Sequence, residues 1–265
     1  MQFGELSNND ITGNCKETNK VNCIYRLNHK IPNLKKNRFN VCSHQSFHYL
    51  SGVCWITSVL DLISRTSLLQ YVKSEIQEWV IDAQTANKNI RGAETSLAIY
   101  LMPESIRDYL YSQNTKYFRK VKGNLYFVGD GGVASSLLYH ILTISSTDTR
   151  VLPKKVFNNR ANDLKQLIRT DVDFKEKFLI IDFSTPKKTL AQIATWLHAN
   201  HTYKKTKVLG GLIMFSDHVM CFTICIKKMS VDIRLCHDGE AIKIEDLQPE
   251  WSKTVQSLQI LVQLK

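Results

Sequence analysis

The segment 51–60, Ser-Gly-Val-Cys-Trp-Ile-Thr-Ser-Val-Leu, places one cysteine at the expected start of a helix. From Trp55 onward apolar residues recur at helical spacing on two adjacent stripes, which predicts a largely enclosed helix over 53–66. Cys54 would lie in its first turn, where backbone N–H groups lack intrahelical acceptors and the helix dipole is positive. Both effects favour the thiolate, which is the nucleophile. The alternative interpretation is that Cys54 is a small buried apolar residue.

A histidine with the right setting to be its partner lies far along the chain. His218 stands between the apolar runs 211–215 and 219–226, at the mouth of an expected strand. A polar turn at 227–230 leads to a further strand, 231–236, which is followed by Asp238. Because a hairpin brings the end of its second strand beside the start of its first, Asp238 is expected next to His218. A carboxylate there would orient the imidazole, which takes the proton of Cys54.

The sequence leaves the identity of this carboxylate open. If the alternation of the strand turns His237 toward the cleft, Asp238 points away from it. Asp217, beside His218, and Asp232, on the expected strand 231–236, are then the alternatives.

Two short segments resemble known cysteine protease motifs. Cys54-Trp55-Ile56-Thr57-Ser58 resembles the nucleophile helix of papain-like cysteine proteases, and Asp217-His218-Val219 resembles their histidine segment. The pattern Cys54-Trp55-x-x-Ser58-x-Leu60 also resembles the cysteine box of ubiquitin-specific proteases, which share the papain-like fold. In that family an Asp on the next strand follows the histidine, as Asp238 does here. The rest of the chain shows no such resemblance.

The resemblance implies a peptide or isopeptide hydrolase. Cys54 would attack the carbonyl, His218 would act first as base and then as acid, and Asp238 would orient His218. Trp55 would shield the Cys–His pair from water, and Asp217 would support it. No metal or organic cofactor is needed for this chemistry, and the paired Cys-x-x-Cys zinc ligands of many ubiquitin-specific proteases are not found in the sequence.

The chain departs from both families at the group that holds the oxyanion. Papain-like enzymes have a glutamine six residues before the cysteine, and here that residue is His48. Ubiquitin-specific proteases have an asparagine five residues before it, and here that residue is Tyr49. We expect a ring N–H of His48 and the backbone N–H of Cys54 to hold the oxyanion, while Gln45 lies one turn further back.

The substrate is expected to be a protein, either ubiquitin-like or a polyprotein, and the resemblance favours a deubiquitinase-like enzyme. Two other functions remain open. One is a catalytically inactive papain-like binding module, which the missing glutamine or asparagine makes credible. The other is a basic nucleic-acid-binding protein, since the net charge of the chain is +11. However, the basic residues are spread out and no nucleic-acid-binding signature is found, so a solvated basic surface is favoured.

Composition and length limit the class of protein further. The 265 residues, 43% of them apolar, suit one large domain or two small ones. We find no apolar run long enough for a transmembrane helix, and the polar residues 1–20 do not resemble a signal peptide. The seven cysteines have no regular spacing, which favours free thiols in an intracellular protein, cytoplasmic or nuclear.

The expected fold class is α+β and papain-like, because helices come first and antiparallel strands later. A basic arm over 1–40 precedes a catalytic domain over 41–265, whose mainly helical part (41–200) carries the cysteine and whose mainly sheet part (201–265) carries the histidine. Helices are expected over 53–66, 68–85, 93–111, 133–143, 161–170 and 189–200. Strands are expected over 123–128, 177–183, 208–215, 219–226, 231–236, 241–244 and 257–264. The glycine-rich turn 129–132 is expected to cap a helix, and its small side chains would leave room for an extended substrate.

Overall fold

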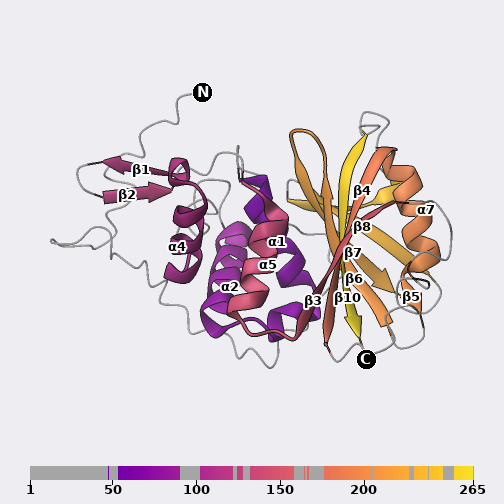
Figure 1. Ribbon diagram of the computed structural model, residues 1–265, viewed down its shortest axis with the longest axis horizontal. Coiled ribbons are helices and arrows are strands. Elements are labelled where there is room, and N and C mark those ends of the chain that lie inside the picture. The colour runs from indigo at the N-terminus through magenta and orange to yellow at the C-terminus, as the bar shows by residue number, and fades with distance from the viewer. Residues whose placement is uncertain are drawn as a thin grey trace.

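The computed structural model shows an α+β protein in which helices cover both faces of one sheet (Figure 1). It describes residues 47, 53–89, 102–121, 124–127, 132–157, 164, 166, 176–203, 206–226, 230–237, 239–246 and 254–264. The expected basic arm, 1–40, lies outside these residues. Among the helices described, none is both long and apolar enough to cross a membrane.

The helices follow the apolar periodicity of the sequence closely. Their bounds are α1 (Cys54–Arg65), η2 (Ser67–Gln70), α2 (Ser74–Asn89), α4 (Glu104–Gln113), η3 (Thr115–Tyr117), α5 (Ala134–Ile144), α7 (Leu190–Asn200) and η4 (Ile244–Asp246). α7 begins at a capping box, in which the Thr189 hydroxyl accepts from the Gln192 N–H and the Gln192 side chain accepts from the Thr189 N–H. α4 begins directly after Pro103, whose backbone nitrogen carries no hydrogen to donate.

The strands form one large sheet and one small hairpin. Their bounds are β1 (Phe118–Val121), β2 (Asn124–Phe127), β3 (Thr149–Val156), β4 (Phe178–Lys188), β5 (Thr202–Tyr203), β6 (Thr206–Met214), β7 (Val219–Ile226), β8 (Val231–His237), β9 (Glu240–Lys243) and β10 (Val255–Leu264). The large sheet has the order β3-β4-β10-β6-β7-β8-β9, with β5 also paired to β6, and β1 pairs with β2. Within the large sheet β3 and β4 are parallel and the other neighbours are antiparallel.

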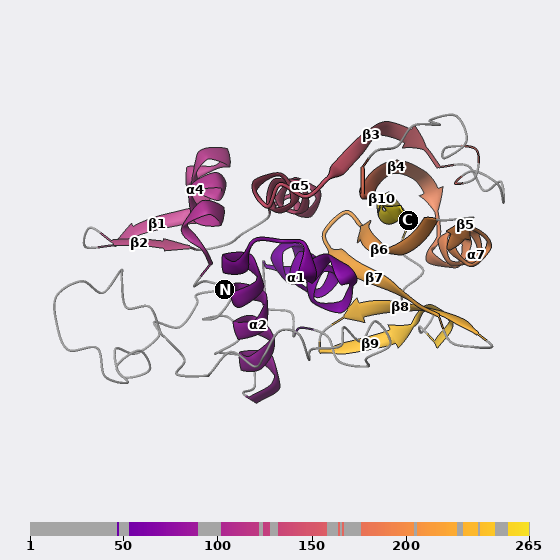
Figure 2. The same cartoon turned by 90° about the horizontal axis from the view of Figure 1, so that it is seen from below.

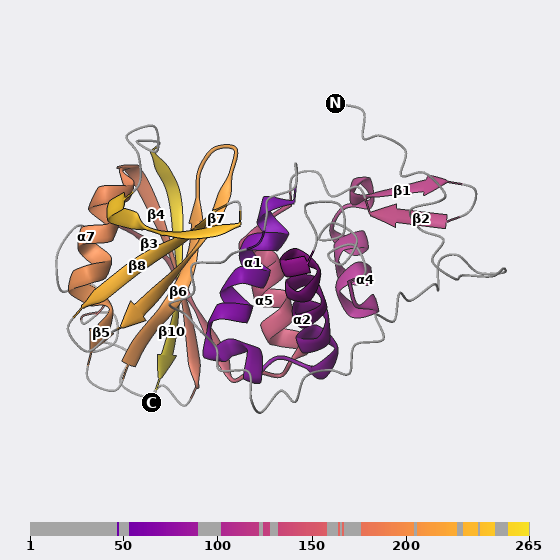
Figure 3. The same ribbon diagram turned by 180° about the vertical axis from the view of Figure 1, so that it is seen from behind.

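Alternating side chains of the sheet enter two separate cores. In β4, Phe178 and Ile180 pack with the residues of α1, α2 and α5, whereas Leu179, Ile181 and Phe183 pack with those of α7. This follows from the two-residue repeat of a strand. Figures 1 and 3 both show α1 between the sheet and α2, with α7 on the opposite face. The helix α1, which carries Cys54, is therefore a central element covered on both sides.

Two adjacent glycines let β6 pack tightly between its neighbours. A Cβ atom at Gly210 would overlap the Phe222 carbonyl of β7, and one at Gly211 would overlap the Gln259 carbonyl of β10. Figure 2 shows the sheet curling strongly through β4, β10 and β6, while β7, β8 and β9 extend below α1. The curvature therefore leaves β7 free to lie along α1.

Some elements differ from those expected. β1 and β3 were not predicted, and the sheet takes β3 and β4 from before residue 200, where mainly helical structure was expected. The expected helix 68–85 is divided into η2 and α2. Of the expected helix 93–111, residues 93–101 lie outside the described residues, and α4 begins only at Glu104. Of the expected helix 161–170, Leu164 and Gln166 are described, and both are helical.

Candidate active site

One stripe of α1 is polar although the helix is almost completely buried. Cys54, Ser58, Asp61 and Arg65 stand at the helical spacing that places residues on one face. Ser58, Asp61 and Arg65 are each at most 3% exposed. The remaining residues of α1 are mainly apolar and belong to the helical core. The polar stripe must therefore find its hydrogen-bond partners inside the protein.

Two of these partners lie on β7. The Ser58 hydroxyl donates to the Val219 carbonyl at 2.9 Å, and Arg65 Nη2 lies 3.5 Å from Thr223 Oγ1. From Ser58 to Arg65 the helix advances about 10 Å, and from Val219 to Thr223 the strand advances about 13 Å. α1 and β7 therefore run in the same direction, nearly in step.

This alignment brings the two predicted reactive residues to the same end of the helix–strand pair. Cys54 lies four residues before Ser58, which is about 6 Å back along the helix axis. A strand advances about 3.3 Å per residue, so about 6 Å back from Val219 corresponds to the two residues before it, Asp217 and His218. Two segments separated by more than 160 residues of sequence are held at this junction by the bond between Ser58 and Val219.

Cys54 is the first residue of α1, and its thiol is free and half-buried. The residue before it, Val53, occupies the N-cap position and makes no side-chain hydrogen bond there. Valine has no side-chain acceptor, whereas most helices begin with Ser, Thr, Asp or Asn at this position. The N-terminus of α1 is therefore not closed by its own cap residue.

His218 comes directly before β7 and is half-buried, and its backbone carbonyl accepts from the Phe215 N–H at 2.8 Å in the turn that ends β6. Asp217 is exposed and accepts a hydrogen bond from the Ser216 hydroxyl at 3.4 Å. Cys54 and His218 are each partly exposed, although the Nε2 atom of His218 is itself buried.

The alternative carboxylate Asp232 is at the wrong end of the sheet. It pairs with Cys225, six residues along β7 from Val219, so it lies about 20 Å along the strand from the start of β7. Its carboxylate is 3.6 Å from Arg234 Nη2 and 3.7 Å from Lys243 Nζ. Asp232 is therefore not a candidate partner for His218, because the hairpin register separates them.

Asp238 and His48 lie outside the described residues, but their immediate neighbours are joined. The Gly239 N–H donates to the Phe47 carbonyl at 2.9 Å. Gly239 has a φ of 88°, which glycine adopts readily, in the turn that links β8 to β9. Cys236 of β8 pairs with Cys221 of β7, so β8 ends level with the start of β7. Strand β8, which precedes Asp238 in the sequence, therefore ends close to the start of β7, which follows His218.

Trp55 points into the helical layer rather than toward β7. Its indole is 2% exposed and its ring centroid lies 5.5 Å from that of Tyr117. Gly132, just before α5, lies so close to the indole that a Cβ atom there would overlap the ring. The last residue of the glycine-rich turn 129–132 therefore packs against the residue that follows Cys54, and residues 129–131 lie outside the described residues.

A buried group of ionisable side chains lies two turns further along α1. The Phe47 N–H donates to both carboxylate oxygens of Asp61, at 3.3 Å each. Burial raises the pKa of Asp61 well above its usual range; the charge of Cys236 raises it further, and Arg65 opposes the shift. Burial likewise raises the pKa of the Cys221 thiol. Burial therefore disfavours the charged forms of Asp61 and Cys221. Burial also acts to raise the pKa of Cys236, but the Cys221 thiol, Arg65 and Arg234 outweigh it and lower that pKa overall.

The expectation of free thiols holds for only some of the described cysteines. Cys54, Cys221 and Cys236 are free, and the last two are buried core residues. Cys225 is also buried, but it is disulfide-bonded. The sequence carried no signal for this bond, because the spacing of the seven cysteines follows no disulfide or metal-binding pattern.

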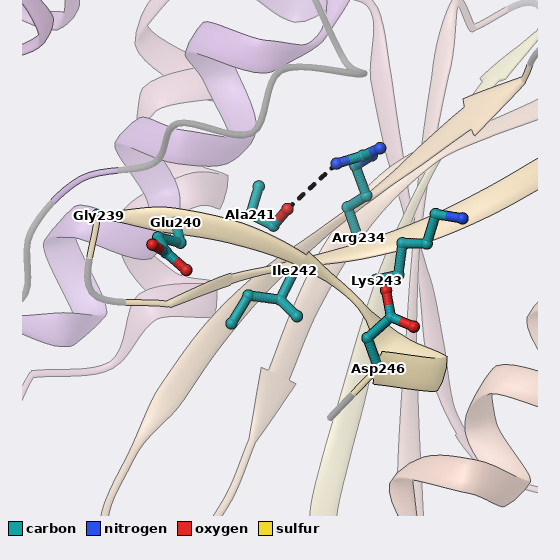
Figure 4. Close-up of a pocket in the computed structure, with 7 residues that line it drawn as sticks. All are labelled: Arg234, Gly239, Glu240, Ala241, Ile242, Lys243 and Asp246. Atoms are coloured by element: carbon teal, nitrogen blue, oxygen red, sulfur yellow. Dashed lines mark hydrogen bonds between the residues drawn. The ribbon is translucent and has the colours of Figure 1, made fainter. Parts of the chain in front are cut away.

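A hollow of about 490 Å³ lies along β8 and β9 (Figure 4). It is lined by Arg234, Gly239, Glu240, Ala241, Ile242, Lys243 and Asp246. Arg234 Nη1 donates to the Ala241 carbonyl at 3.2 Å. Neither Cys54 nor His218 lines this hollow. Gly239, which does line it, donates its N–H to the Phe47 carbonyl.

Sequence reasoning missed two residues that organise this region and one packing contact. Asp61 and Phe47 were not singled out, although a lone carboxylate in an apolar helix is a readable signal, and the glycine-rich turn 129–132 was identified without the packing of Gly132 on Trp55. The described residues contain no group of three or more His, Cys, Asp or Glu side chains that could hold a metal ion. Comparison with protein-family models, curated proteins and solved structures finds no match for this chain.

Proposed function

We propose that this chain is a papain-like cysteine peptidase that hydrolyses peptide or isopeptide bonds through Cys54, His218 and Asp238. The observation that supports the proposal most is the alignment of α1 with β7, fixed by the hydrogen bond from Ser58 to the Val219 carbonyl. It brings a half-buried, free thiol at a helix N-terminus to the level of a half-buried imidazole. A nucleophile beside a base is the minimum arrangement for covalent acyl transfer.

The proposed reaction needs only groups of this chain and a water molecule. His218 takes the proton of the Cys54 thiol as Sγ bonds to the substrate carbonyl carbon. The C–N bond then breaks, and His218 gives the proton to the leaving amine, which leaves a thioester on Cys54. Water transfers a proton to His218 as it attacks the thioester, and Cys54 leaves with that proton restored. Asp238 orients the imidazole through both stages.

The oxyanion of each tetrahedral intermediate is assigned to the backbone N–H of Cys54 and to His48. The first N–H groups of a helix have no intrahelical acceptor, and Val53 supplies no side-chain acceptor at this end of α1. A substrate oxygen there would also meet the positive end of the helix dipole.

The layout of the chain agrees with the papain-like resemblance. The helical layer presents the cysteine at the end of a central helix, and the mainly antiparallel sheet presents the histidine at the start of a strand. The substrate is a protein in this proposal, either ubiquitin-like or a polyprotein, and the cysteine motif favours the ubiquitin-like class.

Alkylation of Cys54 by iodoacetamide tests the proposed pair directly. The rate at Cys54 is followed by peptide mapping from pH 4 to pH 9 in the wild type, His218→Ala and the matched control His198→Ala. His198 lies on α7 and pairs with Glu245 at 2.6 Å, on the opposite face of the sheet. At pH 6 the rate should fall about tenfold or more in His218→Ala, because the sulfur then reacts as an isolated thiol. It should be unchanged in His198→Ala.

Ubiquitin carrying a carboxyl-terminal electrophile then tests the substrate class. Labelling of the wild type and none of Cys54→Ala would support a deubiquitinase-like enzyme. Labelling by iodoacetamide but not by this probe would favour a polyprotein substrate. Equal alkylation of the wild type and His218→Ala across the pH range would contradict the proposal and favour a non-catalytic binding module.

A further inference from the structure

Asp61 connects three segments that are distant in the sequence. It belongs to α1, seven residues after Cys54 on the same face, and is 1% exposed. Both of its carboxylate oxygens accept from the Phe47 N–H, and the Phe47 carbonyl accepts from the Gly239 N–H. The nucleophile helix, the segment at residue 47 and the β8–β9 turn are therefore joined through one carboxylate and one peptide unit.

A carboxyl group is an expensive choice for this position. Burial raises the pKa of Asp61, and the nearby Cys236 raises it further, so the folded protein disfavours the charged form. Arg65 opposes this shift, but its Nη2 also lies 3.5 Å from Thr223 Oγ1. An apolar residue at position 61 would avoid the desolvation penalty. What an apolar residue would not supply is an acceptor for the buried Phe47 N–H.

The two segments that Asp61 joins are next to residues assigned to the site. His48 follows Phe47 in the sequence, and Asp238 precedes Gly239. Consecutive Cα atoms are about 3.8 Å apart, so fixing Phe47 and Gly239 restricts where these two neighbours can lie. Misplacement by about 1 Å of a group that acts on the transition state can reduce a rate roughly 100-fold.

We propose that Asp61 is a positioning residue, which holds Phe47 and the β8–β9 turn against α1 so that His48 and Asp238 are set relative to Cys54. This inference rests on the proposed function for the roles of those three residues. Asp61 itself touches neither substrate nor the reacting atoms. Its contribution is the register between the oxyanion group, the orienting carboxylate and the nucleophile.

Two probes of Cys54 separate this role from general stability. Iodoacetamide alkylates the sulfur in one displacement and creates no oxyanion, whereas p-nitrophenyl acetate acylates it through a tetrahedral intermediate that needs the oxyanion group. In Asp61→Leu, which has no acceptor, acylation should fall at least about tenfold, and alkylation should stay within about threefold of the wild type. Asp61→Asn keeps one acceptor oxygen and should restore most of the acylation rate. Thr66→Val removes another buried hydroxyl of this region, which donates to the Leu62 carbonyl at 2.7 Å, and should leave the ratio of the two rates unchanged.

Amide hydrogen exchange measures the connection without any assumption about catalysis. In the wild type the N–H groups of Phe47 and Gly239 should both exchange slowly. In Asp61→Leu both should exchange faster, although the change was made at neither residue.

The outcomes that overturn the inference differ from those that overturn the proposed function. An Asp61→Leu variant with the wild-type acylation rate, or with an unchanged Gly239 exchange rate, would refute the positioning role. If that variant does not fold, fast exchange at Phe47 or Gly239 in the wild type refutes it instead. A wild type whose Cys54 reacts no faster than that of His218→Ala contradicts the proposed function alone.

Discussion

The hydroxyl of Ser58 makes the bond on which the alignment of α1 and β7 depends. In Ser58→Ala the Val219 carbonyl loses its hydrogen-bond donor from α1, because the alanine methyl group cannot donate in place of the hydroxyl. Ser58 is completely buried, and its hydroxyl lies 2.9 Å from the Val219 carbonyl. We expect this variant to lose both stability and reactivity at Cys54, for separable reasons.

The loss of stability follows from burial. A fully buried acceptor left without its hydrogen bond costs about 1–3 kcal/mol, and the partly buried Val219 carbonyl should fall at the lower end of this range. For a domain of this size each kcal/mol lowers Tm by roughly 2–4 °C. The loss of reactivity follows from position, since Val219 is the residue after His218 and nothing else of α1 is bonded to it in the described residues. A shift of about 1 Å between thiol and imidazole is enough for a loss near 100-fold.

Ser64→Ala is the matched control for this variant. Ser64 is also a buried serine of α1, 6% exposed, but its hydroxyl donates to the Asp61 carbonyl of its own helix at 3.1 Å. Thermal unfolding and the iodoacetamide rate at pH 6 are measured for both variants. Ser58→Ala should lower Tm and slow alkylation of Cys54, whereas Ser64→Ala should affect Tm alone. Equal alkylation rates in the two variants would show that the bond to Val219 does not set the distance between Cys54 and His218.

Two further predictions concern the helical layer. Gly132→Ala should lower Tm by several degrees, because the added methyl group would overlap the buried Trp55 indole and overpacking costs about 1–3 kcal/mol. The control Ser136→Ala, on the exposed surface of α5, should leave Tm unchanged. An unchanged Tm in Gly132→Ala would contradict the contact with Trp55. His140 stacks on Tyr109 at 3.7 Å, and burial lowers its pKa below 6.5. The unfolded chain therefore binds the proton first, so its stabilising contribution is present above pH 6.5 and is lost as the pH falls through the lowered pKa. Chemical denaturation of the wild type and His140→Phe from pH 7.5 to pH 4.5 should show this loss in the wild type only, and parallel profiles would contradict it.

Local patterns in the sequence were sufficient to predict the elements beside or on which Cys54, His218 and Asp238 lie. The helix expected over 53–66 is α1, and the strands expected over 219–226 and 231–236 are β7 and β8. Each has a strong apolar period of 3.6 or 2 residues, or an unbroken apolar run, and these are the signals that report burial. The mixed fold class follows from the order of these elements along the chain.

Elements at the margin of the sheet were harder to predict. β3 contains Arg150, Pro153, Lys154 and Lys155, which break any apolar alternation. Its place at the end of the strand order explains this composition, since proline and lysine are common on edge strands, where they prevent pairing with other chains. A central strand with these residues would not form, so the sequence was uninformative without the topology.

The contacts that assemble the site were beyond sequence reasoning for a different reason. The Ser58 hydroxyl and the Val219 carbonyl are 161 residues apart, and neither residue departs from the pattern of its own element. Asp61 did depart from the pattern of α1, but the partner of its carboxylate is a backbone N–H, which every residue except proline carries. Residue types can therefore suggest a polar contact here, and only the three-dimensional arrangement identifies it.

The position of β10 has a consequence for how the protein is synthesised. β10 (Val255–Leu264) lies between β4 and β6 and is hydrogen-bonded to both, so the sheet is continuous only when these residues are present. During translation the strands that support α1 would emerge from the ribosome before the strand that joins the two halves of the sheet. A nascent chain lacking residues 255–264 would carry Cys54 and His218 on an interrupted sheet, and the proposed Cys–His pair would be supported fully only after the central strand had been inserted.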